Sequence, residues 1–235
     1  MVYLKFQIDK EADLSVWLRF LRPNHINSFG HSWLTSFSKD FLDQVFNKTE
    51  EEQKLFISNH IEKYYIKENL EKFQIKSYNK VKEKLNIIIE RLEKLYNQKL
   101  PVKNIVVKYE TFTCCPYIWQ GKESDTFGLY FAKYVIDGNT EIKVFCHEVM
   151  HLFFHYYYFD YCLSKGLSEN QTKDLKEAVT VLLNLEFKDL IEKKDNGYPN
   201  HQELRQIISE EWQKQEEKNF QKLLDVVIEK IKSLY

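Results

Sequence analysis

Glycine and proline are scarce in this sequence, with 6 and 4 residues among 235. Sandwiches and barrels use these residue types in their many turns, so their scarcity argues against an all-β fold. An excess of one charge sign is also absent, because 34 basic and 35 acidic residues leave a formal net charge of −1. Without a general positive field, we expect no nucleic-acid partner.

Long apolar runs and secretory features are missing as well. The longest apolar run, residues 152–159, is far shorter than the roughly 20 residues of a membrane-spanning helix, and it contains His155. The first residues alternate apolar and polar side chains and do not read as a signal peptide. The four cysteines lack CxxC spacing. We therefore expect a cytoplasmic protein with reduced thiols and no membrane partner.

Hydrophobic spacing predicts a predominantly helical α+β protein. Residues 4–8 alternate in polarity and predict one strand, whereas apolar residues recur every three or four positions across residues 10–100. Pro23 and residues 27–30 are expected to interrupt this helical half, and its last helix covers about residues 77–98. No change in composition marks a linker, so the pattern predicts a single domain spanning residues 1–235.

The second half, residues 101–235, is expected to combine a small mixed sheet with helices. Two β-rich runs, residues 105–113 and 127–136, are predicted to be neighbours in this sheet, with 127–135 as its exposed edge. Thr140 is expected to cap the next helix, and Asn200 with Glu203 to form a capping box for a later one. The predicted helical segments are Glu141 to about Tyr161, Ser168–Lys194, a helix after Asn200, and Phe220–Leu234.

Residues 147–151 read His-Glu-Val-Met-His, the pattern HExxH. On a helix, His147 and His151 lie one turn apart on the same face, about 6 Å from each other, so both imidazoles can bind one zinc ion. Glu148 lies beside the first histidine, where it can act as the base that activates a water molecule. About 0.02 chance matches are expected in a chain of this length with 7 histidines, so coincidence is a poor explanation.

The motif, together with the β-rich runs that precede it, resembles the zincin metallopeptidases over about residues 105–185. This resemblance implies a buried HExxH helix beneath a small mixed sheet, one zinc ion per chain, and a peptide or protein substrate that pairs with the edge strand. The metzincin branch does not fit, because Phe154 stands where that branch has glycine and no methionine follows Met150. The first hundred residues resemble no family.

The third zinc ligand has two candidates, Glu177 and His155. The gluzincin branch of the zincins takes a glutamate from a downstream helix, which implies Glu177. In an unbroken helix, His155 would lie about 12 Å along the axis from His147 and about 80° around it, out of reach of the same ion. Residues 152–154 contain no glycine or proline to break the helix. We therefore expect Glu177 to be the ligand and His155 to lie near the site.

Further polar residues are candidates for supporting roles. Thr180 and Asn184 follow Glu177 along one helix face and are expected to hydrogen-bond to the ligands. Gluzincins commonly carry an acidic residue four positions after the ligand glutamate, and this chain has Val181 there. A donor to the oxyanion of the reaction is expected from the last third of the chain, where the candidates are Tyr198, His201 and Arg205.

Two other functions compete with peptide hydrolysis. A di-iron helical bundle also uses ExxH, but it needs two such motifs and this chain has one. A catalytically inactive zincin-like protein, or a metal-stabilised helical module that binds proteins, remains as the alternative. Glu148 argues against this alternative, because a structural zinc site has four protein ligands and no need for a base. The sequence therefore predicts a gluzincin-type zinc metallopeptidase and leaves the oligomeric state open.

Overall fold

The computed structural model describes residues 2–22, 37–67 and 70–234. Its architecture is mostly helical with a small mixed sheet, which confirms the expected α+β class. The strands are β1 (Tyr3–Ile8), β2 (Asn104–Glu110), β3 (Tyr117–Ile118) and β4 (Thr126–Ala132). The α-helices are α1 (Lys10–Phe20), α3 (Lys39–Phe46), α4 (Glu50–Lys67), α5 (Leu70–Tyr96), α6 (Lys133–Asp137), α7 (Glu141–Phe153), α8 (Phe159–Ser164), α9 (Glu169–Ala178), α10 (Leu183–Glu186), α11 (Gln202–Lys214) and α12 (Phe220–Leu234).

The sheet has the strand order β1-β2-β4-β3. Strands β1, β2 and β4 are parallel, and β3 runs antiparallel to β4. Tyr3 lies opposite Asn104, which in turn lies opposite Thr126, so the three parallel strands begin in register. The prediction that the two β-rich runs are neighbours is therefore confirmed.

The predicted edge strand is wrong. Strand β4 ends at Ala132 and is paired on both sides, because the chain after Pro116 folds back as β3 and becomes the outermost strand. Tyr117 and Ile118 lie opposite Leu129 and Gly128, and the main-chain N–H of Tyr130 donates to the oxygen of Pro116 over 3.0 Å. A two-residue strand leaves too short an alternating pattern to be recognised in the sequence.

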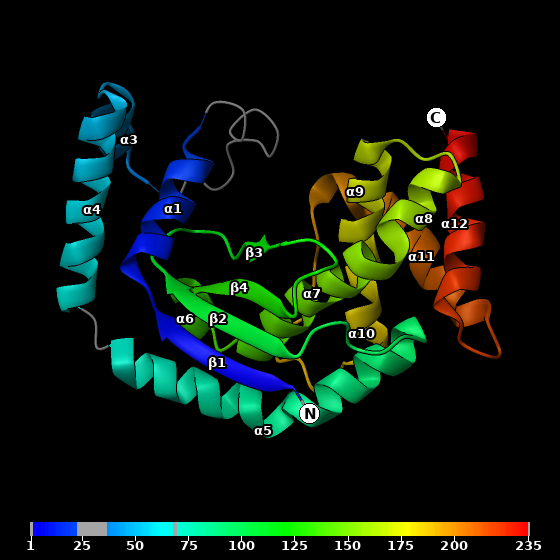
Figure 1. The fold of residues 1–235 in the computed structure, drawn as a ribbon. Helices are drawn as coiled ribbons and strands as arrows, with labels where there is room; N and C mark the ends of the chain where they lie inside the picture. Colours follow the sequence, from blue (N-terminus) through cyan, green and yellow to red (C-terminus); the bar gives the residue numbers. More distant parts are fainter. Residues whose placement is uncertain (1, 23–36, 68–69, 235) are drawn as a thin grey trace.

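Helix α5 runs along the sheet and fixes helix α7, which carries HExxH (Figure 1). At the start of α7, the buried Glu141 carboxylate accepts a hydrogen bond from Lys80 Nζ over 2.8 Å. Further along, the buried hydroxyl of Tyr96 donates to the main-chain oxygen of Met150 over 3.2 Å. Both contacts join α5 to α7, so the motif lies on a helix that is held at two points.

Helix α1 lies between α4 and the sheet (Figure 1), and a second apolar cluster joins α1 to α4 and to the end of β2. Trp17 is its centre, fully buried and in edge contact with Phe112, with ring centroids 4.8 Å apart. The indole N–H of Trp17 donates to the Thr111 hydroxyl over 2.9 Å. This cluster covers the carboxyl end of β2 and so closes the sheet at the end from which the chain enters the loop before β3.

Several helix boundaries differ from the predictions. The helix after Thr140 turns into a π-helix at Phe154–Tyr158, and the segment after Ser168 ends at Glu186 instead of Lys194. The Thr140 hydroxyl makes no cap and donates to the main-chain oxygen of Val135, because the chain enters α7 directly from a tight turn. Asn200 forms no capping box, since a 3-10 turn at Pro199–His201 precedes α11.

Two predictions meet the limits of the described chain. The interruptions expected at Pro23 and residues 27–30 lie outside the described residues. Within residues 2–22, 37–67 and 70–234, no helix has the length and apolar character that crossing a membrane requires.

Candidate metal centre

Three predicted metal-binding side chains converge in the structure. His147 and His151 lie one turn apart on α7, with ring centroids 4.6 Å apart, and Glu177 reaches them from the last turn of α9. Glu177 Oε2 lies 3.4 Å from His151 Nε2 and 3.8 Å from His147 Nε2. The candidate ligand atoms of all three residues lie within 4.8 Å of one another.

This donor set fits a zinc ion. Zinc binds imidazole nitrogen and carboxylate oxygen at about 2.0–2.2 Å in tetrahedral geometry, so two ligand atoms of one ion lie about 3.4 Å apart. The two distances from Glu177 Oε2 are close to that value. Three protein ligands leave one tetrahedral position for water, which is typical of catalytic rather than structural zinc sites.

Asp195 orients the first histidine and was not predicted. Its Oδ2 lies 2.7 Å from His147 Nδ1, and the carboxylate is 94% shielded from solvent, with 6% of the side chain exposed. A histidine that donates through Nδ1 keeps the lone pair of Nε2 for a metal ion, so this contact selects the useful tautomer. Asp195 is therefore the carboxylate that orients His147.

Asp195 is itself held by the predicted supporting residues. Asn184 forms two hydrogen bonds of 2.8 Å with its main chain, one in each direction. Arg205 donates to the Asp195 carboxylate over 2.9 Å and to the Thr180 hydroxyl over 2.8 Å. The Thr180 hydroxyl lies 3.1 Å from Asp195 Oδ1, the carboxylate oxygen to which Arg205 also donates. The Thr180 hydroxyl also lies 2.8 Å from the main-chain oxygen of Glu177, as expected, whereas Asn184 and Arg205 act on the centre through Asp195.

Burial and neighbouring charges shift the pKa values of the three converging residues. Burial lowers the pKa of His147, but the Asp195 carboxylate outweighs burial and raises it to about 10. Burial lowers the pKa of His151 to about 3, so its imidazole is neutral at neutral pH. Burial alone would raise the pKa of Glu177, but His151 and Lys176 hold it well below its ordinary value. Glu177 is therefore a carboxylate that faces the neutral imidazole of His151 and the imidazole of His147, which holds its proton at neutral pH and would release it on binding a metal ion.

Glu148 has the properties of a buried base. Only 6% of the residue is exposed. Burial, with the nearby Glu177 and Asp195 carboxylates, raises the pKa of Glu148 to about 8, although His147 acts in the opposite direction. A carboxyl with a pKa near neutrality can both accept and return a proton, which a group with an ordinary carboxyl pKa does less well. This carboxyl is next to the ligands in sequence without being one of the three converging donors.

Lys176 and Tyr117 also border the centre, and neither was predicted. The ammonium of Lys176 lies 2.5 Å from Glu177 Oε1 and 5.0 Å from the centre of the Tyr117 ring. Tyr117 comes from β3, and its ring centroid lies 5.3 Å from that of His151. The outermost strand therefore lies directly beside the second histidine of the motif.

His155 lies near the centre and outside the ligand set, as expected, although not for the expected reason. The helix is not α-helical beyond Phe153, because residues 154–158 form a π-helix. His155 Nε2 is 2.5 Å from the Tyr117 hydroxyl, and its ring stacks between Trp119 and Phe159. These contacts, and not helix rotation alone, hold His155 away from the three converging donors.

The remaining oxyanion candidates differ in position. His201 is buried and its Nε2 lies 3.0 Å from Asp174 Oδ1, so the ring is engaged with α9. Tyr198 is 49% exposed. Burial of its hydroxyl end, with the charges of Glu177 and Glu148, raises the pKa of Tyr198 above its ordinary value. The Tyr198 hydroxyl therefore lies close enough to Glu177 and Glu148 for their charges to affect its pKa.

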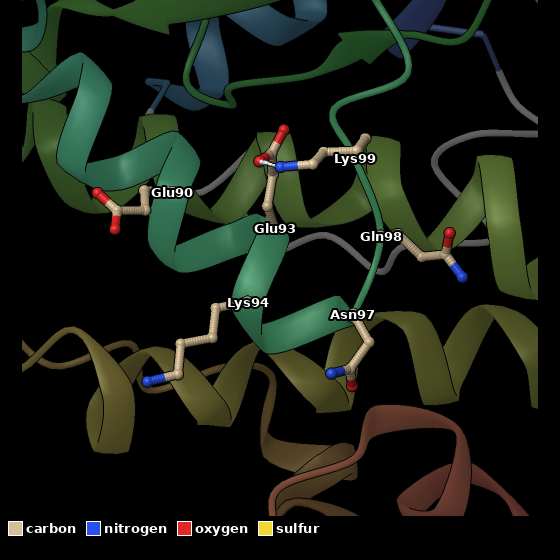
Figure 2. Close-up of a pocket in the computed structure, with 6 residues that line it drawn as sticks. All are labelled: Glu90, Glu93, Lys94, Asn97, Gln98 and Lys99. Atoms are coloured by element: carbon tan, nitrogen blue, oxygen red, sulfur yellow. Dashed lines mark hydrogen bonds and ion pairs between the residues drawn. The ribbon is translucent and has the colours of Figure 1, made fainter.

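A surface pocket elsewhere has a different character. Figure 2 shows six polar or charged side chains around it, all from the end of α5 and the residues just after it. Two of them, Lys99 and Glu93, form an exposed ion pair of 2.7 Å. Among the described residues that line it there is no histidine, cysteine or buried carboxyl, so this pocket does not contribute to the centre.

Comparisons of the chain with known protein families, with curated proteins and with solved structures find no match. Any function must therefore be argued from the centre itself.

Proposed function

We propose that this protein is a zinc-dependent peptidase of the gluzincin type. The observation that carries the proposal is the convergence of His147, His151 and Glu177 next to the buried carboxyl of Glu148. Asp195 supports it further, because it fixes the orientation of one proposed ligand. A small mixed sheet with an exposed edge strand near the HExxH helix is also what the zincin resemblance implies.

In this proposal, His147, His151 and Glu177 hold the zinc ion. The ion supplies Lewis-acid activation of a water molecule and of the scissile carbonyl group. Glu148 accepts a proton from the attacking water and transfers it to the departing amine. Burial raises the pKa of Glu148 above its ordinary value, so its carboxylate form is a stronger base than that of an exposed glutamate. The Tyr198 hydroxyl is the proposed donor to the oxyanion, because His201 and Arg205 are engaged with Asp174 and Asp195.

The substrate would bind as an extended peptide along β3. This strand is the outermost of the described sheet, so its outer main-chain groups can pair with another strand. Tyr117 places β3 beside His151, which would bring a paired peptide close to the metal centre. The edge strand proposed from the sequence, 127–135, is replaced by β3 in this role.

The proposal is tested by metal analysis together with a peptide-library digest. The protein is purified without chelators or nickel columns, and we expect about one zinc per chain and cleavage of peptides. Glu148→Gln should keep the zinc and the fold but lose at least about 10²–10⁴-fold in rate, because an amide cannot accept the proton. Glu141→Gln is the matched control, since Glu141 is buried on the same helix but pairs with Lys80 outside the centre.

The outcomes separate the two candidate functions. Zinc without cleavage would favour a metal-stabilised binding module over a peptidase. Cleavage by Glu148→Gln within about tenfold of the wild-type rate would show that Glu148 is not the base.

A further inference from the structure

Lys176 is a buried cation in contact with a proposed metal ligand. Only 5% of the residue is exposed, and its Nζ lies 2.5 Å from Glu177 Oε1. On another side the ammonium lies 5.0 Å from the centre of the Tyr117 ring. Tyr117 is held in turn by the 2.5 Å contact between its hydroxyl and His155 Nε2. The ammonium is therefore enclosed between a carboxylate and an aromatic face.

The two oxygens of Glu177 have different neighbours. Oε2 faces the imidazoles of His151 and His147, whereas Oε1 is bonded to Lys176. A carboxylate with one oxygen held by an ammonium offers only the other oxygen to a metal ion. The negative charge of Glu177 is also shared between two cations whenever a metal ion is bound.

We propose that Lys176 is a positioning residue that limits Glu177 to one coordinating oxygen and weakens the affinity of the centre for a divalent cation. The inference rests on the proposed function, because it concerns the same metal centre. Its consequence is a metal ion that is bound less tightly than His147, His151 and Glu177 alone would bind it.

Removal of the Lys176 charge has two opposing effects on the affinity for a metal ion. Loss of the ammonium frees the carboxylate to turn, and lost orientation of a ligand weakens metal binding by about 10–100-fold. Loss of the ammonium also removes the repulsion between a charge of +1 and a charge of +2 on the same buried carboxylate. We expect this repulsion to be the larger contribution, because Lys176 is only 5% exposed and its charge is weakly screened by water. Removal of the charge should therefore strengthen metal binding.

The experiment is an equilibrium titration with Zn²⁺ against a chelating dye of known affinity, at one fixed pH. Lys176→Met keeps the length of the buried stem and removes the charge, and we expect it to bind Zn²⁺ about tenfold or more tightly than the wild type. Lys176→Arg keeps the charge and should stay within about threefold of the wild type. Lys173→Met is the matched control, because Lys173 lies one turn earlier on α9, is exposed and pairs with Glu169.

Circular dichroism checks that each variant is folded. If Lys176→Met does not fold, Lys176→Gln is used in its place. Equal or weaker Zn²⁺ binding by the charge-free variant would overturn the inference and leave the peptidase proposal intact, since the wild type would still bind the ion. An equal gain in Zn²⁺ affinity in Lys173→Met would also overturn the inference, because loss of any nearby positive charge would then explain the gain in Lys176→Met. A wild-type protein that binds no Zn²⁺ would overturn both proposals.

Discussion

At the scale of single residues, Glu177 and His155 compete for the third ligand position. The structure separates them by their contacts: Glu177 Oε2 faces both imidazoles, whereas His155 is bonded to Tyr117 and stacked between two aromatic rings. Substitution of each residue in turn tests which of them binds the metal ion.

Glu177→Gln should weaken zinc binding by about a hundredfold or more, because an amide is a poor zinc ligand. Glutamine is preferable to alanine here, since its oxygen can still accept from the buried Lys176. His155→Ala should keep stoichiometric zinc and lose at most about 10–100-fold in affinity. Zinc titration of both variants is the measurement, and the reverse order of affinities would make His155 the ligand.

Residues differ in how far the sequence reveals them. His147, Glu148 and His151 could be predicted to lie together, because helix geometry alone brings positions i and i+4 to one face. Asp195 could not, since it lies in an irregular segment whose path depends on Asn184 and Arg205. Lys176 cannot be told from the other helix lysines in the sequence, because its burial depends on packing that includes Tyr117.

At the scale of elements, the turn that carries Asp195 supports the metal centre from outside. Gly197 has φ +62°, and a Cβ there would lie 2.6 Å from Arg205 Nη1. Any side chain at this position must therefore displace Arg205, which donates to Asp195 over 2.9 Å. Gly197 is thus linked to His147 through two side-chain contacts, the one between Arg205 and Asp195 and the one between Asp195 and His147.

Gly197→Ala should weaken zinc binding by about 10–100-fold, because the displaced arginine releases Asp195 from its position behind His147. Gly121→Ala is the matched control: Gly121 also has a positive φ, of 86°, but a Cβ there has no heavy atom within 4 Å. Both variants should lose about 1–2 kcal/mol of unfolding free energy through backbone strain. If zinc titration finds equal affinities for the two, Asp195 does not depend on Arg205.

Element boundaries were predicted well where periodicity is long and poorly where packing decides. Strand β1 and the amphipathic end of α5 follow from spacing alone. The π-helix at Phe154–Tyr158 contains no glycine or proline, so no local signal announces it, and its aromatic residues adopt it to pack against Tyr117, Trp119 and Tyr96. Strand β3 forms because β4 provides a pairing partner for Tyr117 and Ile118. This pairing depends on the whole fold and cannot be predicted from the two residues alone.

At the scale of the whole molecule, two buried carboxyls make stability depend on pH. Asp13 and Glu110 are both fully buried, and neither Glu110 oxygen has a hydrogen-bond partner among the described residues. Burial raises the pKa of Asp13 to about 6 and the pKa of Glu110 well above its ordinary value. Groups that hold their proton more tightly when folded stabilise the protein at low pH, and this stability is lost as pH rises through the folded-state pKa values.

Glu110→Gln should reduce this dependence. Near pH 5 the variant and the wild type should have similar unfolding free energies, since both side chains are uncharged when folded. Toward pH 8 the unfolding free energy of the wild type should decrease relative to that of the variant by up to about 1.4 kcal/mol per pH unit. The reason is that only the unfolded state of the wild type releases the Glu110 proton readily. Urea unfolding at several pH values, with a metal chelator present, measures the difference. Glu217→Gln, at an exposed position, is the control and should track the wild type.

The pairing of β1 with β2 has a consequence for how the chain acquires its structure during synthesis. Tyr3–Ile8 finds its only partner strand of the described sheet in residues 104–109. Translation at about 5–20 residues per second must therefore continue for several seconds, and the ribosome must release β2, before the first strand can be paired. Until then, the apolar side chains of β1 and α1 have no sheet to cover. During that interval β1 stays unpaired, and its apolar side chains are accessible to chaperones that bind apolar segments.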